Sequence, residues 1–261
     1  NRFLAPMVDI ITRYQGTVDE FQGDGILAFF GAPLASTDDP ERAVACAVEM
    51  QRALVDINAE QRRRGLPELQ MGIGINTGEV IVGNIGSEKR TKYGALGTPI
   101  NTAYRIESST VSGQVLISPS TYEQVKDVVR VGHTWGVQFK GLDELIQVYE
   151  VKGLNGEYSC SMPEETPEHF LDLDPPLSIE CFILEGKTVA DNAIAGRIER
   201  LSGNCAQGVL DGAVEENMNL KVRLAPHDAR ISEVYAKVMQ STPMSGNDGT
   251  RIVLNFTSLP D

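Results

Sequence analysis

The sequence lacks three features that mark common classes of protein. Its 23 lysines and arginines against 36 acidic residues leave a net charge of -13, which argues against a nucleic-acid partner because binding a polyphosphate chain needs a basic face. It contains no apolar run long enough to cross a membrane and no signal peptide. Its four cysteines include no C-x-x-C pair, which fits reduced thiols better than zinc or disulfides. We therefore expect a cytoplasmic protein.

Length and composition predict two domains. At 261 residues the chain exceeds one typical domain, and 41% apolar residues can build a core for each of two. The composition changes after Val151, where Gly, Glu, Ser and Pro become frequent. We therefore expect a first domain over residues 1–152, a linker over 153–176 and a second domain over 177–261.

A turn near the start of the chain presents a single carboxylate. The stretch VDEFQGDGILAFF, residues 18–30, predicts two short strands joined at Gly23-Asp24-Gly25. The flanking glycines allow a sharp turn that leaves Asp24 at the tip. Asp-Gly is a common hairpin turn, and on its own this stretch favours nothing more. The alternative is a carboxylate presented to a hard cation such as Mg²⁺.

A second stretch, KYGALGTPINTAYRIES at residues 92–108, predicts a strand that ends at Gly97 and a helix that opens at Thr98-Pro99. Asn101 and Arg105 are four residues apart and project from one face of that helix. An amide and a guanidinium suit a sugar and a polyphosphate. Taken alone, the pair is better explained as an ordinary solvated helix face.

Together these stretches resemble the class III nucleotidyl cyclase catalytic domain, the family of adenylyl and guanylyl cyclases. The resemblance lies in four collinear segments, at residues 16–33, 74–108, 112–125 and 139–151. It implies an α+β fold with a ferredoxin-like βαββαβ core and an active site shared by a homodimer. The family's first strand, which carries a second metal-binding Asp, has no counterpart, because the chain opens within a helix at residues 3–14. We therefore expect a bare sheet edge and a longer natural polypeptide with an upstream sensor domain.

The resemblance also implies roles for individual residues. Asp24 would bind the catalytic Mg²⁺ or Mn²⁺ ions of a two-metal site, Asn101 would orient the ribose, and Arg105 would stabilise the transition state. Lys140 would contact the polyphosphate. The metal Asp of one subunit would serve the Asn-Arg helix of the other.

Two positions in the family read the purine, and here they are Glu20 and Gly94. Adenylyl cyclases usually carry Lys at the first and Asp or Thr at the second, and guanylyl cyclases often carry Cys at the second. An ionised Glu only accepts hydrogen bonds, so Glu20 matches the N1-H and N2 amino donors of guanine. The backbone N-H of Gly94 is a candidate donor to the guanine O6. We therefore predict GTP as the substrate. The alternative for Glu20 is an exposed strand glutamate.

Further elements follow from periodicity. A long helix should begin near Ser36 to Asp39, and Arg62, Arg63 and Arg64 should form a solvated cap at its end. Residues 69–76 and 80–85 are interpreted as strands paired with each other around Thr77-Gly78.

The alternating apolar pattern of the C-terminal part predicts six short strands that form a small antiparallel β-barrel. Residues 196–210 weakly resemble a PilZ domain, a family known for binding cyclic di-GMP. Its Arg-x-x-x-Arg is missing, since no arginine lies between Arg130 and Arg197, and only Ser202 matches the ligand turn. We expect no cyclic di-GMP binding here, and a regulatory or dimer-supporting barrel instead.

The predicted function is a guanylate cyclase that makes 3′,5′-cyclic GMP and pyrophosphate for second-messenger signalling. Two alternatives remain open. One is an adenylate cyclase that makes cyclic AMP, and the other is a non-catalytic cyclase-like module for regulation or dimerisation.

Overall fold

The computed structural model describes residues 3–87, 90–138, 145–164, 169–185, 188–224, 233–244 and 249–258. The chain divides into two compact units, Asn1–Glu164 and Glu165–Asp261, each with its own core. The stretch expected as a linker, residues 153–176, contains the short strand β9 (Cys160–Ser161) and the start of β10 (Leu171–Glu185).

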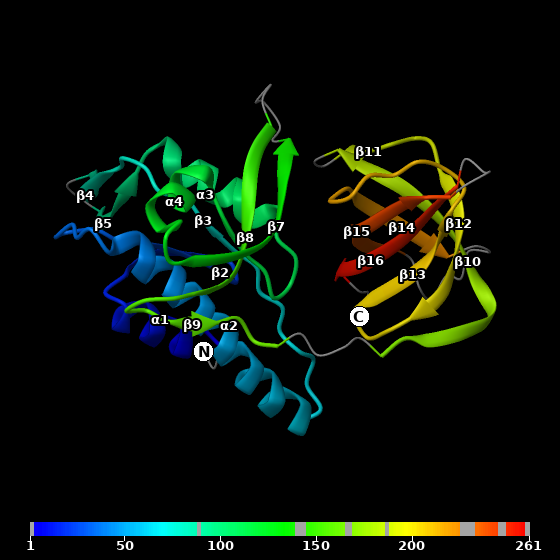
Figure 1. Ribbon diagram of the computed structural model, residues 1–261, viewed down its shortest axis with the longest axis horizontal. Helices are drawn as coiled ribbons and strands as arrows, with labels where there is room; N and C mark the ends of the chain where they lie inside the picture. Colours follow the sequence, from blue (N-terminus) through cyan, green and yellow to red (C-terminus); the bar gives the residue numbers. More distant parts are fainter. Residues whose placement is uncertain are drawn as a thin grey trace. The chain divides into compact units, whose positions relative to one another are not determined.

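The first unit is an α+β fold, as the sequence predicts (Figure 1). Its helices are α1 (Leu4–Arg13), α2 (Asp39–Arg63), α3 (Thr98–Ser108) and α4 (Pro119–Val125). Its strands, besides β9, are β1 (Thr17–Gln22), β2 (Gly25–Phe29), β3 (Ile73–Ile75), β4 (Ile81–Ser87), β5 (Arg90–Leu96), β6 (Val115–Ile117), β7 (Val129–Gln138) and β8 (Leu145–Leu154).

A central sheet with strand order β3-β6-β8-β7 separates two helical layers. The three residues of β6 are fully buried and alternate between the layers. Val115 and Ile117 pack in one cluster with α2, whereas Leu116 packs in another with Ile106 of α3. Because both faces are covered, β6 is apolar throughout rather than alternating with polar residues.

The hairpin β1–β2 forms a separate two-stranded sheet. Its apolar side, with Val18, Ile26 and Ala28, packs against Ile10 and Ile11 of α1 and Cys46 of α2. A cavity of about 250 Å³ lies between β2 and β3. Within the described residues β2 pairs only with β1 and β3 only with β6. Among the described residues, the two strand edges beside this cavity therefore have no strand partner, which agrees with the expected bare sheet edge.

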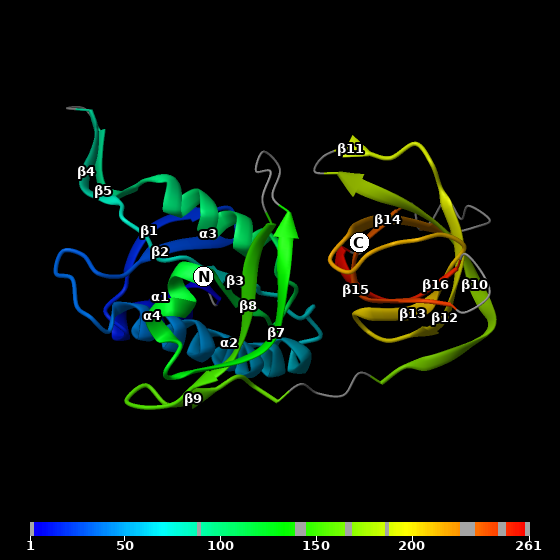
Figure 2. The ribbon, with the colours of Figure 1, turned by 45° about the horizontal axis from the view of Figure 1, so that its top comes forward.

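The expected pairing of residues 69–76 with 80–85 is wrong. Instead, β3 pairs in parallel with β6, and β4 pairs antiparallel with β5. Gly74 shows why, because a Cβ there would lie 2.3 Å from the backbone nitrogen of Glu107, so β3 runs directly under α3. Ile81 of β4, in contrast, is 77% exposed. A strand packed directly against a helix and a strand that projects from the unit cannot form one hairpin. Figures 1 and 2 show β4–β5 projecting in this way.

The end of α2 confirms the solvated cap. Arg62 pairs with Glu68, and Arg63 and Arg64 both pair with Glu60, on side chains that are all more than 40% exposed. Such exposed pairs contribute little stability and leave the run as a local helix terminus.

The second unit is the predicted β-barrel. Beside the short β11 (Thr188–Val189), its strands are β10, β12 (Ile194–Leu201), β13 (Cys205–Leu210), β14 (Asn219–Leu224), β15 (Val234–Pro243) and β16 (Thr250–Ser258). They pair in the order β10-β12-β13-β16-β15-β14, and β14 pairs again with β10. The sheet therefore closes on itself around an apolar interior, as Figure 2 shows.

Cys46, Cys160, Cys181 and Cys205 are free thiols, as expected. Among the described residues, none of the helices has both the length and the apolar character that crossing a membrane requires.

Candidate active site

Asp24 lies where the sequence places it, at the tip of the β1–β2 hairpin. Gln22 pairs with Gly25, so Gly23 and Asp24 form a two-residue turn, and Gly23 takes the left-handed conformation at φ +63°. The Asp24 side chain is exposed and has no hydrogen-bond or ion-pair partner among the described residues. This suits one oxygen ligand of Mg²⁺, which takes one or two protein carboxylates and fills its shell with phosphate oxygens and water.

A β-bulge in β1 changes the direction of the next side chains. Val18 pairs with Ala28 and Glu20 with Leu27, so Asp19 has no partner in the ladder. In a regular strand Asp19 and Glu20 would point to opposite faces. Here both contact the same ammonium group, because Lys92 Nζ lies 2.8 Å from Asp19 Oδ1 and 2.9 Å from Glu20 Oε2. The bulge thus gathers two carboxylates around Lys92 of β5.

Glu20 is held as an ionised acceptor. The Lys92 ammonium donates to Oε2, and the Gln22 amide donates to Oε1 at 2.8 Å. The hydrogen bond from Lys92, followed by that from Gln22, lowers the pKa of Glu20. Its side chain is 37% exposed, so the carboxylate remains accessible. Each carboxylate oxygen can accept two hydrogen bonds, so these contacts leave acceptor capacity for a ligand.

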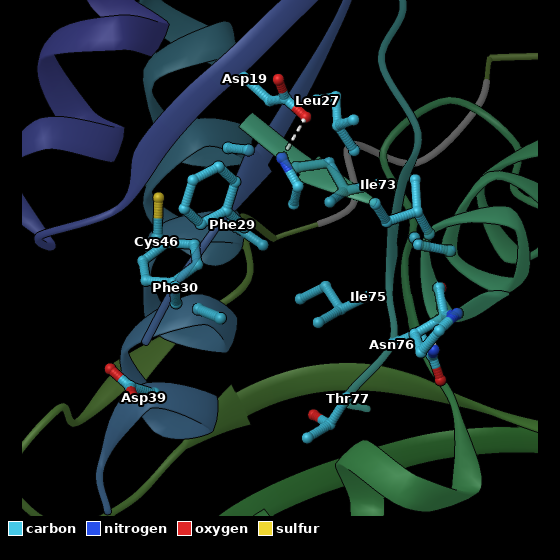
Figure 3. A pocket seen from close by; sticks show the side chains of 18 of the residues that line it. Asp19, Leu27, Phe29, Phe30, Asp39, Cys46, Ile73, Ile75, Asn76 and Thr77 are labelled. Atoms are coloured by element: carbon cyan, nitrogen blue, oxygen red, sulfur yellow. Dashed lines mark hydrogen bonds between the residues drawn. The ribbon is translucent and has the colours of Figure 1, made fainter. Parts of the chain in front are cut away.

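Gly94, the second predicted purine reader, lies beside Asp19. A Cβ at Gly94 would be 2.4 Å from Asp19 Oδ1. The backbone N-H of the next residue, Ala95, donates to Asp19 Oδ2 at 3.2 Å, which Figure 3 draws as a dashed line. Phe29 and Tyr93 add a ring contact with centroids 6.2 Å apart. The two predicted purine readers are therefore brought together by β1 and β5.

Helix α3 follows β5 directly and carries the amide-guanidinium pair. Asn101 is exposed and Arg105 is half-buried one turn later, and neither side chain has a polar partner among the described residues. Ile106, fully buried against the central sheet, fixes the rotation of the helix. The face with Asn101 and Arg105 is therefore left open for a ligand.

Tyr104 links α3 to the Glu20 cluster. Its hydroxyl oxygen is buried and lies close enough to Glu20 to interact with that carboxylate. Burial, followed by the negative charges of Glu20 and Asp19, raises the pKa of this phenol. The hydroxyl therefore stays protonated and is a donor close to the two carboxylates.

Asp19, Lys92 and Tyr104 were not predicted from the sequence as members of this cluster. The only available signal was the adjacent pair Asp19-Glu20, since a bulge cannot be recognised from one strand alone. Lys140, the predicted polyphosphate contact, lies outside the described residues. Within the described ranges no group of three or more His, Cys, Asp or Glu could hold a metal ion by itself.

Comparisons with known proteins agree with this geometry. Residues 4–158 match the family model of the adenylate and guanylate cyclase catalytic domain. The crystal structure of the guanylyl cyclase Cya2 is 52% identical, with a TM-score of 0.60 over 62% of this chain and 83% of that one. The adenylyl cyclase CyaB from P. aeruginosa is 34% identical, with a TM-score of 0.54 over 57% and 78%.

Among curated proteins, "Adenylate cyclase 1" of Rhizobium meliloti (strain 1021) is 34% identical over 148 residues. The match covers 56% of this chain but 22% of that protein, so the chain spans about a fifth of its relative's length. The first unit of this chain belongs to the adenylate and guanylate cyclase catalytic domain family.

Proposed function

We propose that the protein is a guanylate cyclase. It would convert GTP to 3′,5′-cyclic GMP and pyrophosphate by in-line attack of the 3′-hydroxyl on the α-phosphorus. The observation that carries this choice is the Glu20 carboxylate, ionised and accessible at the position that reads the purine.

Glu20 selects guanine through its hydrogen-bonding character. Its free lone pairs accept from the N1-H and N2 amino group of guanine, whereas adenine N1 would meet it as another acceptor. A buried mismatch of this kind costs about 1–3 kcal/mol, or roughly one to two decades in kcat/KM. Lys92 supports the choice because its hydrogen bond lowers the pKa of Glu20 and so favours the ionised, acceptor-only form.

The open face of α3 would carry the chemistry. Arg105 offers a planar fork of donors to the phosphoryl oxygens, where negative charge develops in the transition state. Asn101 would hold the ribose so that the 3′-oxygen lines up with phosphorus. Lys140 would neutralise the polyphosphate. Bound Mg²⁺ or Mn²⁺, with Asp24 as one ligand, supplies a lower pKa for the hydroxyl and charge screening.

The active site would form between two copies of the chain. Asp24 lies at an exposed hairpin tip and has no contact with Asn101 or Arg105 in its own chain among the interactions of the described residues. In a two-fold homodimer every contact between the protomers occurs twice. Asp24 of one protomer and Arg105 of the other can therefore face the same bound nucleotide, in two equivalent sites. The apolar side chains of Ile81, Tyr93 and Leu96, which are 77%, 42% and 54% exposed, would be covered by this contact.

An adenylate cyclase remains the second candidate because of Lys92. Its ammonium is 46% exposed and lies beside Glu20, so it is a donor that adenine N1 would accept. The relatives include cyclases of both kinds. The third candidate, a non-catalytic module, is disfavoured because the Arg105 and Asn101 side chains have no polar partner among the described residues.

The barrel is proposed as a regulatory or dimer-supporting unit within second-messenger signalling. Arg200, which occupies the Asp/Asn position of the PilZ ligand motif, lies in β12 and is already engaged. It pairs with Asp172 at 3.0 Å, donates to Gln207 at 3.0 Å and stacks over the Phe170 ring. This supports the expectation that the barrel does not bind cyclic di-GMP.

The test is to incubate the purified protein with Mn²⁺ or Mg²⁺ and either GTP or ATP, and to quantify the cyclic product. We expect cyclic GMP in excess, and almost none from Arg105→Ala. Glu20→Lys should erode the GTP preference. Excess cyclic AMP would refute the base assignment, and no product from either nucleotide would refute the enzyme.

A further inference from the structure

Asp19 is a buried carboxylate to which neither the sequence analysis nor the proposed reaction gives a role. Its side chain is 2% exposed, although the Lys92 side chain beside it is 46% exposed. It reaches this position through the β-bulge and holds two groups of β5, the Lys92 ammonium at 2.8 Å and the Ala95 N-H at 3.2 Å. Both interactions fix a short side chain that has little freedom to move.

The Asp19 carboxylate fills the space beside Gly94. A Cβ at Gly94 would lie 2.4 Å from Oδ1 and 3.2 Å from Cγ of Asp19, and 3.3 Å from Cε of Lys92. The first distance is far below any real contact of a Cβ atom. Gly94 is not among the described residues with positive φ, so space rather than backbone conformation requires glycine here.

A neighbouring glycine gives the contrast. Gly83 pairs with Gly94 across the β4–β5 ladder, yet a Cβ at Gly83 would meet no atom within 4 Å. The two glycines lie in the same β-ladder, but only Gly94 has another side chain, Asp19, at the position of its missing Cβ. The restriction at Gly94 therefore comes from Asp19 and not from the sheet.

We propose that Asp19 is a specificity-determining positioning residue. By filling the space over Gly94 it closes the second purine-reading position to side chains, and by holding the Ala95 N-H it fixes β5 next to Glu20. Base selection then rests on the side chain at position 20 alone. This inference rests on the proposed function, because it concerns how the same site chooses its nucleotide.

A consequence follows for any attempt to change the substrate at position 94. Thr at this position would offer an acceptor to the adenine amino group, but only if the side chain can be seated. With Asp19 present, its Cβ must displace a buried carboxylate from two partners. With Asp19 shortened to Ala, the same side chain has room.

The experiment is a double-mutant cycle with a volume control. We would compare wild type, Asp19→Ala and Asp19→Asn, each with Gly94 and with Gly94→Thr, and measure kcat/KM for GTP and for ATP. Gly94→Thr alone should lower both values and leave their ratio within about threefold of wild type. In the Asp19→Ala background it should move the ratio toward ATP by about tenfold. Asp19→Asn should behave like wild-type Asp19, because the amide fills the same volume.

An equal shift of the ratio in all three backgrounds would overturn the proposal. If no variant makes a cyclic product, the proposed function fails, but the inference is still tested by denaturation of the same proteins. Gly94→Thr should then lower the unfolding midpoint more when residue 19 is Asp or Asn than when it is Ala. Equal losses in the three backgrounds would overturn the inference independently.

Discussion

Ile106 allows a test of how α3 is positioned. Its side chain is fully buried against Leu116 and Val148 of the central sheet. Ile106→Ala removes three carbon atoms, which costs about 2.4 kcal/mol at about 0.8 kcal/mol for each. The whole cost of such a substitution, with the cavity left behind included, is about 2–5 kcal/mol. The cavity also allows α3 to shift against the sheet and to displace Arg105. A misplacement of about 1 Å in a catalytic group can cost about 100-fold in rate.

Ile117→Ala is the matched control. Ile117 is equally buried but faces the opposite layer, where it packs with α2. Both variants should lose a similar free energy of unfolding, measured by urea denaturation with circular dichroism. At a temperature where both remain folded, Ile106→Ala should show a kcat about tenfold lower than Ile117→Ala. Equal kcat values for the two variants would refute the argument that Ile106 aligns Arg105, and the milder Ile→Val pair repeats the test if either alanine variant unfolds.

Two further predictions concern stability. Gly94→Ala should lower the free energy of unfolding by about 1–3 kcal/mol through overpacking against Asp19. Gly83→Ala should be neutral or stabilising by up to about 1 kcal/mol. Equal effects of the two variants in chemical denaturation would contradict the contact between residue 94 and Asp19. Hydrogen bonds from Ser36 and Tyr158 lower the pKa of Asp38 from 3.8 to about 2. These hydrogen bonds therefore contribute fully to the stability of the folded state above pH 3.8, and the contribution is lost as the pH falls through about 2. Tyr158→Phe should therefore be less stable than wild type at pH 7, with a difference that shrinks below pH 4 in thermal melts; a pH-independent difference would contradict this linkage.

Regular local patterns predicted most elements of this fold. The helical spacing of apolar residues located α1 and α2, and Gly23-Asp24 located the first hairpin. These signals are local, because each depends on residues a few positions apart. The six strands of the barrel were predicted for the same reason.

Long-range pairing and irregular geometry were beyond the sequence. The partner of β3 is β6, some forty residues later, because close packing against α3 outweighs proximity along the chain. The bulge at Asp19 breaks the alternation that every strand prediction assumes. For that reason Glu20 was predicted as a base reader from the family pattern, whereas Lys92 and Asp19 emerged only from the structure.

The most direct measurement of the central claim is complementation between two inactive variants. Asp24→Ala and Arg105→Ala should each be inactive alone, because each damages both sites of a homodimer. When the two are co-expressed, a mixed dimer keeps one site with Asp24 from one protomer and Arg105 from the other. Random pairing should then restore about a quarter of the wild-type production of cyclic GMP. Activity no higher than that of the separate variants would contradict a site shared between two chains.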